Sequence, residues 1–350
     1  MTLPVGIRNF SYSGDMAIVR TKTQWVFVAG LLALLFTAPL YLNHYWLSVG
    51  NIIGITIIAA VGLNILVGYC GQLSIGHVGF IAVGAYTSAI LTHRFGAPFL
   101  VGLVSAGVVA GLVGIIFGLP SIRVKGFYLA ITTIAAQFII LWVIEHWNLT
   151  GGFQGLTVPL ASIGGLVFAS ESSLFYLIIV ITIICVLVGV NLSRTKVGRA
   201  FIAVRDNDLA AEVMGINLLY YKLLAFFIGC FFAGIAGSLY AHYTGSLNPE
   251  QFSFTESILY VGMIIIGGLG TNLGPIVGVI FIRVLQQVLL GNVVPWLEHT
   301  FTMFPAGFAS GVAPMLFGLV IVLFLVLEPR GISHRWSLLK AAYRLWPFSY

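Results

Sequence analysis

Charged residues are scarce in this sequence. They make up 7% of its 350 residues, and 59% of the residues are hydrophobic. An ordinary soluble domain contains about 25% charged residues. A soluble fold cannot bury so much apolar surface in one core, so the composition excludes that class and favours a protein whose solvent is lipid. The apolar runs are long and uninterrupted, not alternating as in barrel strands, and they therefore predict an all-α membrane protein.

The sequence also lacks the residues that several kinds of chemistry require. Its three cysteines, Cys70, Cys185 and Cys230, lie in apolar runs, so no disulfide framework or zinc spacing is visible. No Gly-Lys dipeptide occurs, which excludes a GxxxxGK[ST] phosphate loop. Acidic residues are almost absent from the apolar runs, which argues against a proton- or sodium-coupled carrier. No nucleophile–base pair is apparent, so we expect no enzymatic activity.

Ten apolar segments predict a bundle of about ten transmembrane helices. A crossing needs about 20 apolar residues. The third, eighth and tenth segments are shorter than this and lie beside glycine-rich loops, which predicts broken or re-entrant helices. The segments are residues 25–42, 49–67, 78–91, 99–119, 127–144, 174–192, 222–243, 257–267, 273–290 and 315–327.

The basic residues predict the orientation of this bundle. With an even number of crossings, nearly all Lys and Arg residues fall on the side of the N-terminus, and cytoplasmic loops attract such residues. We therefore expect both termini in the cytoplasm. The predicted parts are a cytoplasmic N-terminal segment (1–24), a transmembrane domain (25–327) with a cytoplasmic loop at 193–221, and a basic cytoplasmic tail (328–350).

Two features inside the apolar segments have more than one interpretation. Arg283 should face the bundle, a cavity or a partner, because a charge within a span costs at least about 2.5 kcal/mol. A structural role beside Gln286 and Gln287 is favoured over contact with a transported solute.

Glycines four residues apart, such as Gly107 and Gly111, either permit close helix packing or reflect the abundance of glycine in membrane helices.

Glycine-rich segments with polar side chains lie at 68–79 and 150–156. Polar groups at membrane depth often line a pathway, although at 68–79 they could instead tie down helix ends, and 150–156 could be an ordinary turn. The candidate pathway residues are Gln72, Ser74, His77, Thr150 and Gln154. A third segment, 266–278, also joins two short apolar runs, as expected of a transporter built from two repeats with matching broken helices.

The longest strongly charged inner loop contains a predicted short helix at 208–214. Asp208 can cap its N-terminus, and Gly215 can end it in the left-handed conformation. Leu209, Val213 and Met214 offer an apolar surface. This surface suits either a groove on a partner protein or the inner leaflet of the membrane.

Six blocks in order along the chain resemble one family. They are GYCGQLSIGHVGF with GAY (68–80 and 84–86), KGFYLA (125–130), TGGFQG (150–155), the inner loop 198–216, GGLGTNLGP (267–275) and EPRG (328–331). Together they resemble the branched-chain amino-acid permeases of bacterial and archaeal ABC importers. The SIGH and TGG blocks resemble the M-type paralogue of that family.

This resemblance implies a multi-pass protein of the bacterial or archaeal inner membrane, working with other chains. Expected partners are a paralogous H-type permease, two cytoplasmic P-loop ATPases and an external binding protein that delivers leucine, isoleucine or valine. This chain would hold no cofactor, since ATP and magnesium would bind the ATPases. The helix at 208–214 becomes the expected coupling element, although its Ala-Ala-Glu order departs from the Glu-Ala-Ala of other ABC permeases. The expected coupling residues are Arg205, Asp208, Glu212 and Gly215.

Two alternatives stay open at this point. The same architecture in relatives carries urea, short amides or other small organic solutes, and nothing in the sequence separates these cargoes. A self-sufficient channel or secondary carrier is the other alternative, and it would transport without ATP.

Overall fold

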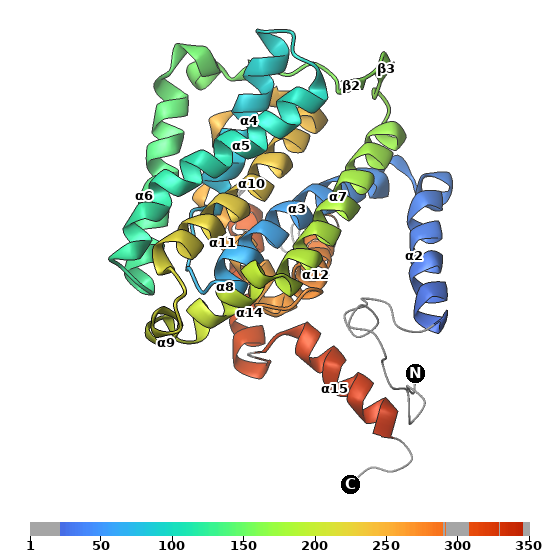
Figure 1. The fold of residues 1–350 in the computed structure, drawn as a ribbon. Coiled ribbons are helices and arrows are strands. Elements are labelled where there is room, and N and C mark those ends of the chain that lie inside the picture. The colour runs from blue at the N-terminus through green and yellow to red at the C-terminus, as the bar shows by residue number, and fades with distance from the viewer. Residues whose placement is uncertain (1–21, 290, 292–307, 329, 346–350) are drawn as a thin grey trace.

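The computed structural model describes residues 22–289, 291, 308–328 and 330–345, and most of them lie in helices (Figure 1). Each of the ten predicted apolar segments contains a helix, which confirms the all-α prediction. These helices are α2 (Lys22–Tyr41), α3 (His44–Leu63), α4 (His77–His93), α5 (Phe99–Gly118), α6 (Phe127–His146), α7 (Glu171–Arg194), α10 (Leu218–Thr244), α11 (Phe254–Gly267), α12 (Gly274–Val288) and α14 (Phe308–Leu327).

Among the described residues, five helical segments are long and apolar enough to cross a membrane: His44–Tyr69, Phe99–Ile122, Phe127–His146, Glu171–Arg194 and Leu218–Thr244. α4 and α11 have 17 and 14 residues, so they are short, as predicted. The tenth segment was predicted to be short as well, and this was wrong. α14 has 20 residues and continues through Pro314, which membrane helices tolerate better than soluble ones do.

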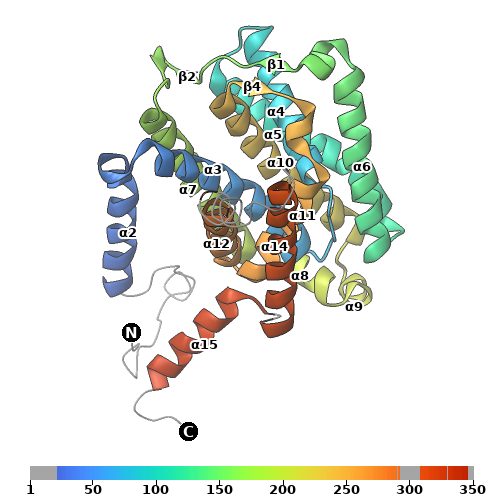
Figure 2. The same cartoon turned by 180° about the vertical axis from the view of Figure 1, so that it is seen from behind.

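The helix α3 lies at the centre of the bundle and continues into the π-helix η1 (Asn64–Tyr69). It packs against α10, α7 and α12, and α10 in turn packs against α4 and α5 (Figures 1 and 2). In the most apolar stretch of His44–Tyr69, 89% of the residues are buried, compared with 33% for α7. The peripheral helices therefore expose apolar side chains, and lipid is the solvent that such faces require.

The paired glycines in α5 leave room for aromatic side chains of α10. A Cβ on Gly107 would lie 2.8 Å from the Phe231 ring, and one on Gly111 would lie 2.8 Å from the Phe227 ring. Both rings belong to α10. The structure therefore favours the interpretation in which glycines four residues apart let two helices pack closely.

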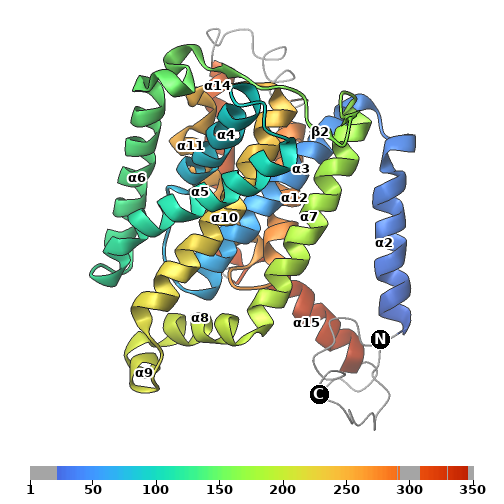
Figure 3. The same ribbon diagram turned by 45° about the horizontal axis from the view of Figure 1, so that its top comes forward.

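The two ends of the bundle differ (Figure 3). One end carries three helices outside the ten segments: α8 (Lys196–Asp206), α9 (Asp208–Val213) and α15 (Ile332–Leu345). The other end carries two antiparallel pairs, β1 with β4 and β2 with β3. The remaining short elements are β1 (Leu156–Thr157), β2 (Ser162–Ile163), β3 (Leu166–Val167), β4 (Ser246–Leu247), η2 (Leu119–Ile122), η3 (Asn148–Thr150), η4 (Gly152–Gln154) and η5 (Pro249–Phe252).

The contact between α4 and α10 predicts a test of this packing. A Cβ on Gly84 would lie 2.3 Å from Gly234 Cα, so Gly84→Val must push two backbones apart. We expect it to cost at least about 1–3 kcal/mol and to lower the Tm of the detergent-purified protein. Gly30→Val is the matched control, because nothing lies within 4 Å of a Cβ on that helical glycine. Equal Tm values for the two variants would contradict the packing described here.

Candidate functional site: a clamp between two broken helices

The two glycine-rich interruptions at 68–79 and 266–278 meet in the structure. The Asn64 amide joins them, since its Nδ2 donates to the Thr271 carbonyl at 3.0 Å and its Oδ1 accepts from the Gly270 N–H at 2.9 Å. The Tyr69 hydroxyl donates to Asn272 Oδ1 beside it. Asn64 is 2% exposed. These three contacts, which we call the clamp, satisfy polar groups that the breaks leave open.

Glycine is required where the segments 68–79 and 266–278 cross. A Cβ on Gly68 would lie 2.5 Å from the Gly270 nitrogen, which no side chain could occupy. Gly270 itself has φ +70°, a conformation that only glycine adopts at little cost. The close contact between the two segments therefore explains Gly68 and Gly270, whereas Gly76 and Gly79 lie against Thr133 and Gln137 of α6.

Arg205 connects the clamp to α8. Its Nη1 donates to the Gly68 carbonyl oxygen at 2.8 Å, and its Nε donates to Asp206 Oδ1 at 2.9 Å. The aliphatic part of the Arg205 side chain lies against Gly71, where a Cβ would come within 2.8 Å. Arg205 thus joins α8 directly to the end of the π-helix η1.

The short helix α9 is present where it was predicted, with a different cap. Asn207 is the N-cap residue, because its Oδ1 accepts from the Ala210 N–H at 3.0 Å. Asp208 was expected in that role, but its carboxylate forms ion pairs with Lys125 and, at 3.6 Å, with Lys222. These two partners come from the α5–α6 connection and from the first turns of α10. Asp208 therefore joins α9 to two other parts of the bundle.

The charge on Asp208 is stable at physiological pH. The hydrogen bond from Lys125 and the positive charges of Lys125 and Lys222 hold the pKa of Asp208 below its usual value, against a smaller effect of burial. A lowered pKa means that the folded protein favours the carboxylate. The stabilisation is complete above the usual Asp pKa of about 3.9 and is lost only as the pH falls through the lowered value.

Gly215 ends α9 in the left-handed conformation, as predicted, with φ +84°. The Gly215 N–H donates to the Glu212 carbonyl at 2.9 Å, and Glu212 itself is exposed. The side chains of Leu209, Val213 and Met214 are 68%, 87% and 81% exposed. A cavity of about 640 Å³ adjoins this apolar surface and is lined by residues that include Ile122, Lys125, Asp208, Leu209, Glu212, Gly215 and Lys222.

Three of the predicted pathway residues are buried near this end of the bundle. Gln72 donates to the Cys70 carbonyl at 3.3 Å, and His77 Nε2 lies 3.2 Å from the Ala59 carbonyl oxygen. Ser74 Oγ and His77 Nδ1 have no partner among the residues that the structure describes. Gln72 also lines a second cavity together with Arg205 and the Asp208 carboxylate, so it lies beside the predicted coupling residues.

The other two predicted pathway residues lie at the opposite end of α6. The 20 residues of this helix separate Lys125 from Thr150 by about 30 Å. The Thr150 hydroxyl is within 2.6 Å of the Ile144 and Trp147 carbonyls and therefore caps the helix, whereas Gln154 is exposed. The structure does not bring the five pathway residues into one site, and their role in a pathway stays a prediction.

The sequence interpretation missed several residues that hold this region together. They are Asn64, Lys125 and Lys222 around the clamp and α9, and Gln137 and Ser257, whose side chains share a buried hydrogen bond of 2.7 Å between α6 and α11. Asn64 and Gln137 are amides inside apolar segments, and this alone marks them as candidates for a structural or functional role.

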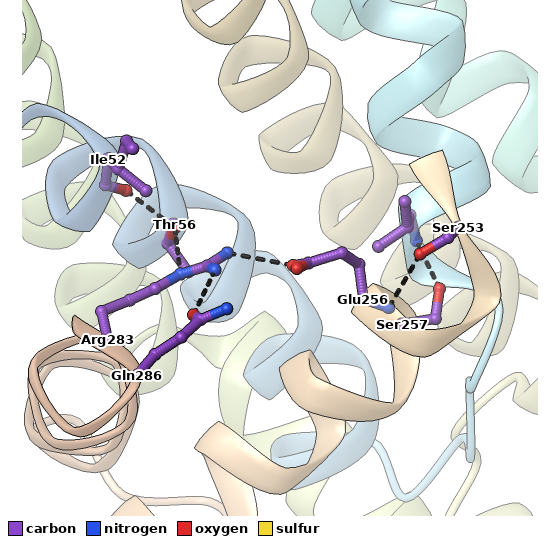
Figure 4. A network of polar contacts seen from close by, with 8 residues as sticks. Ile52, Thr56, Ser253, Glu256, Ser257, Arg283 and Gln286 are labelled. Carbon is purple, nitrogen blue, oxygen red and sulfur yellow. Dashed lines mark hydrogen bonds and ion pairs between the residues drawn. The ribbon is translucent and has the colours of Figure 1, made fainter. Parts of the chain in front are cut away.

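Arg283 faces the interior of the bundle (Figure 4). Its Nη2 lies 3.1 Å from Glu256 Oε2, its Nη1 donates to Gln286 Oε1 at 2.9 Å, and its Nε donates to Thr56 Oγ1 at 3.3 Å. The predicted neighbour Gln286 is thus confirmed. The other predicted neighbour, Gln287, donates to the Tyr45 hydroxyl instead. The ion pair with Glu256, across α11 and α12, was not predicted.

The Arg205 contact predicts a measurable effect on the clamp. Arg205→Met keeps the aliphatic stem and removes the hydrogen bond to Gly68, which is worth about 1.5 kcal/mol at a partly exposed site. We expect roughly tenfold faster hydrogen exchange at the backbone amides of residues 70–72. Arg199→Met is the control, since Arg199 lies on the same helix and its side chain donates, within the described part of the chain, only to the nearby Arg194 carbonyl. Unchanged exchange in the Arg205 variant would contradict the link between α8 and η1 described above.

Several known protein sequences are similar to this chain. Residues 45–327 match the sequence model of the family described as "Branched-chain amino acid transport system / permease component". The chain is 31% identical over 294 residues to the high-affinity branched-chain amino acid transport system permease protein LivM of Escherichia coli K12, covering 77% of this chain and 69% of that protein. It is 27% identical over 323 residues to a probable LivM of Methanocaldococcus jannaschii, covering 80% and 90%.

A more distant relative is named for the import of a different solute. The autoinducer 2 import system permease protein LsrC of Klebsiella pneumoniae is 28% identical over 265 residues, covering 74% of this chain and 67% of that protein. No solved structure matches the chain significantly. The matched region contains both broken helices, the clamp and α9, and the chain belongs to the family of permease components of branched-chain amino acid transport systems.

Proposed function

We propose that this chain is the M-type permease subunit of an ATP-driven ABC importer for leucine, isoleucine and valine. It would form the pathway with a paralogous H-type permease, receive cargo from an external binding protein and be driven by two cytoplasmic P-loop ATPases. Family membership supports the permease role, and the names of the LivM relatives support the cargo.

The observation that carries the ATP-driven part is the exposed apolar face of α9. Leu209, Val213 and Met214 project from a helix that Asp208 fastens to the bundle and that lies beside a cavity of about 640 Å³. An amphipathic helix of this kind suits a hydrophobic groove on a partner. A force on α9 would pass through α8 and Arg205 to the clamp, and so change how the two broken helices meet.

The proposed topology has ten crossings with both termini in the cytoplasm of a bacterium or archaeon. The end of the bundle that carries α8, α9 and α15 would be cytoplasmic, since α8 contains Lys196, Arg199 and Arg205 and cytoplasmic segments attract basic residues. The proposal includes the division into a cytoplasmic segment 1–24, a transmembrane domain 25–327 and a cytoplasmic tail 328–350, in which α15 is helical. The sequence analysis did not predict the helices α8 and α15, because charged residues interrupt their apolar residues and no long apolar run results.

Co-purification from native membranes tests the assembly. After gentle detergent extraction, mass spectrometry should identify a second, similar permease and two P-loop ATPases. Recovery of this chain alone from a preparation proven intact would instead support a self-sufficient channel or carrier. Competition for uptake then separates the cargoes, because leucine should compete with radiolabelled leucine while urea and autoinducer 2 should not.

Gly215 tests the coupling role of α9. Gly215→Val forces a β-branched residue to φ +84°, at a cost of about 1–2 kcal/mol, although no atom lies within 4 Å of its Cβ. We expect ATP hydrolysis without matching uptake, and normal membrane insertion. The control is Gly96→Val, which has the same kind of strain at φ +63° and equal free space at the opposite end of the bundle. Wild-type uptake in the Gly215 variant would contradict the proposal.

A further inference from the structure

A small cavity lies where α3, α4, α10, α11 and α12 converge. Its volume is about 180 Å³, which is enough for one small solute. Its walls are mainly apolar and include Ile52, Ile55, Val78, Ile81 and Phe252. Two groups of opposite charge, Arg283 and Glu256, also line this cavity.

The two charged groups are held in place by different neighbours. Thr56 and Gln286 accept hydrogen bonds from Arg283 Nε and Nη1, so the guanidinium keeps its orientation independently of Glu256 (Figure 4). Glu256 lies in the first turn of α11, and its N–H is bound by the Ser253 cap at 3.4 Å. The remaining guanidinium nitrogen, Arg283 Nη2, lies 3.1 Å from Glu256 Oε2.

A partly buried ion pair of this kind is a costly way to hold a bundle together. The side chains of Arg283 and Glu256 are 14% and 30% exposed, and desolvation offsets much of the attraction between buried charges. Well-packed apolar residues would join α11 and α12 at least as firmly. Ionisable residues inside a membrane bundle accordingly mark solute pathways more often than scaffolds.

We propose that this cavity is a subsite for an α-amino acid zwitterion with a small apolar side chain, in which Arg283 binds the carboxylate and Glu256 binds the ammonium group. A carboxylate suits the planar guanidinium. The cavity thus offers one partner for each charged group of the solute, and its apolar walls would contact the solute's side chain. The solute would insert between two groups that otherwise pair with each other. This assignment rests on the proposed function and names the residues of the permease that contact its cargo.

The cavity is connected to the clamp through the helices that line it. Thr56 and Asn64 are eight residues apart on α3 and η1, about 12 Å along the axis, and α12 runs from Gly274 beside the clamp to Arg283 at the cavity. A shift in the clamp therefore moves the Arg283 helix and the Thr56 helix together. The same shift that α9 receives would then change the distance between the two charges.

A double substitution distinguishes a binding role from a structural one. Either single change would leave an unpaired, partly buried charge and destabilise the protein, so we choose Glu256→Gln with Arg283→Met. If the pair only supports the fold, this neutral variant keeps wild-type uptake. If it binds cargo, uptake of radiolabelled leucine by the complete reconstituted importer with its binding protein falls at least tenfold, while Tm, assembly and stimulated ATP hydrolysis stay close to wild type.

A second variant leaves both charges in place and fills the space. Ile52→Phe enlarges one wall of the cavity, and we expect it to reduce leucine uptake at least tenfold as well. Wild-type uptake in both variants overturns the cavity assignment while the proposed function stands. A wild-type importer that takes up urea and no amino acid overturns the proposed cargo, and the zwitterion subsite with it.

Discussion

Lipid cannot hydrogen-bond the backbone groups that a broken helix leaves open, so every break in this bundle must be satisfied by protein. Here polar side chains of neighbouring segments satisfy groups in both breaks. The Asn64 amide spans from η1 to the Gly270 N–H and the Thr271 carbonyl, and Arg205 supplies a charged donor to the Gly68 carbonyl. These contacts join the two breaks and α8 into one connected structure.

This constraint explains why the outer features of the bundle are arranged around the clamp. α3 and α12 extend from it towards the cavity that Arg283 and Glu256 line, and α8 extends from it towards the exposed face of α9. The Asp208 pairs with Lys125 and Lys222 fix α9 against the bundle at neutral pH. A single connected structure thus links a surface suited to a cytoplasmic partner with a charged cavity among the spans.

The accuracy of the sequence interpretation depended on the range of each interaction. Long apolar runs are a local property, so the ten helices appear where hydropathy predicted them, apart from the longer α14. The amphipathic helices α8 and α15 are marked by the periodic spacing of their apolar residues and not by a high mean hydropathy. The sequence analysis did not use this periodicity and therefore did not predict them. The cap of α9 was misplaced by one residue, since Asn207 and Asp208 are equally good caps and Asp208 has distant partners in Lys125 and Lys222.

The sequence by itself determined that this is an all-α membrane protein, which end of it is basic, where its helices break and to which family it belongs. These properties follow from composition, local patterns and ordered motifs, all of which can be read along one chain. Only the tertiary structure decided that the breaks at 68–79 and 266–278 meet at Asn64, that Arg205 joins them to α8, and that Arg283 pairs with Glu256. Those contacts join residues 27 to 207 positions apart, and no local pattern encodes which distant partner a buried polar group will find.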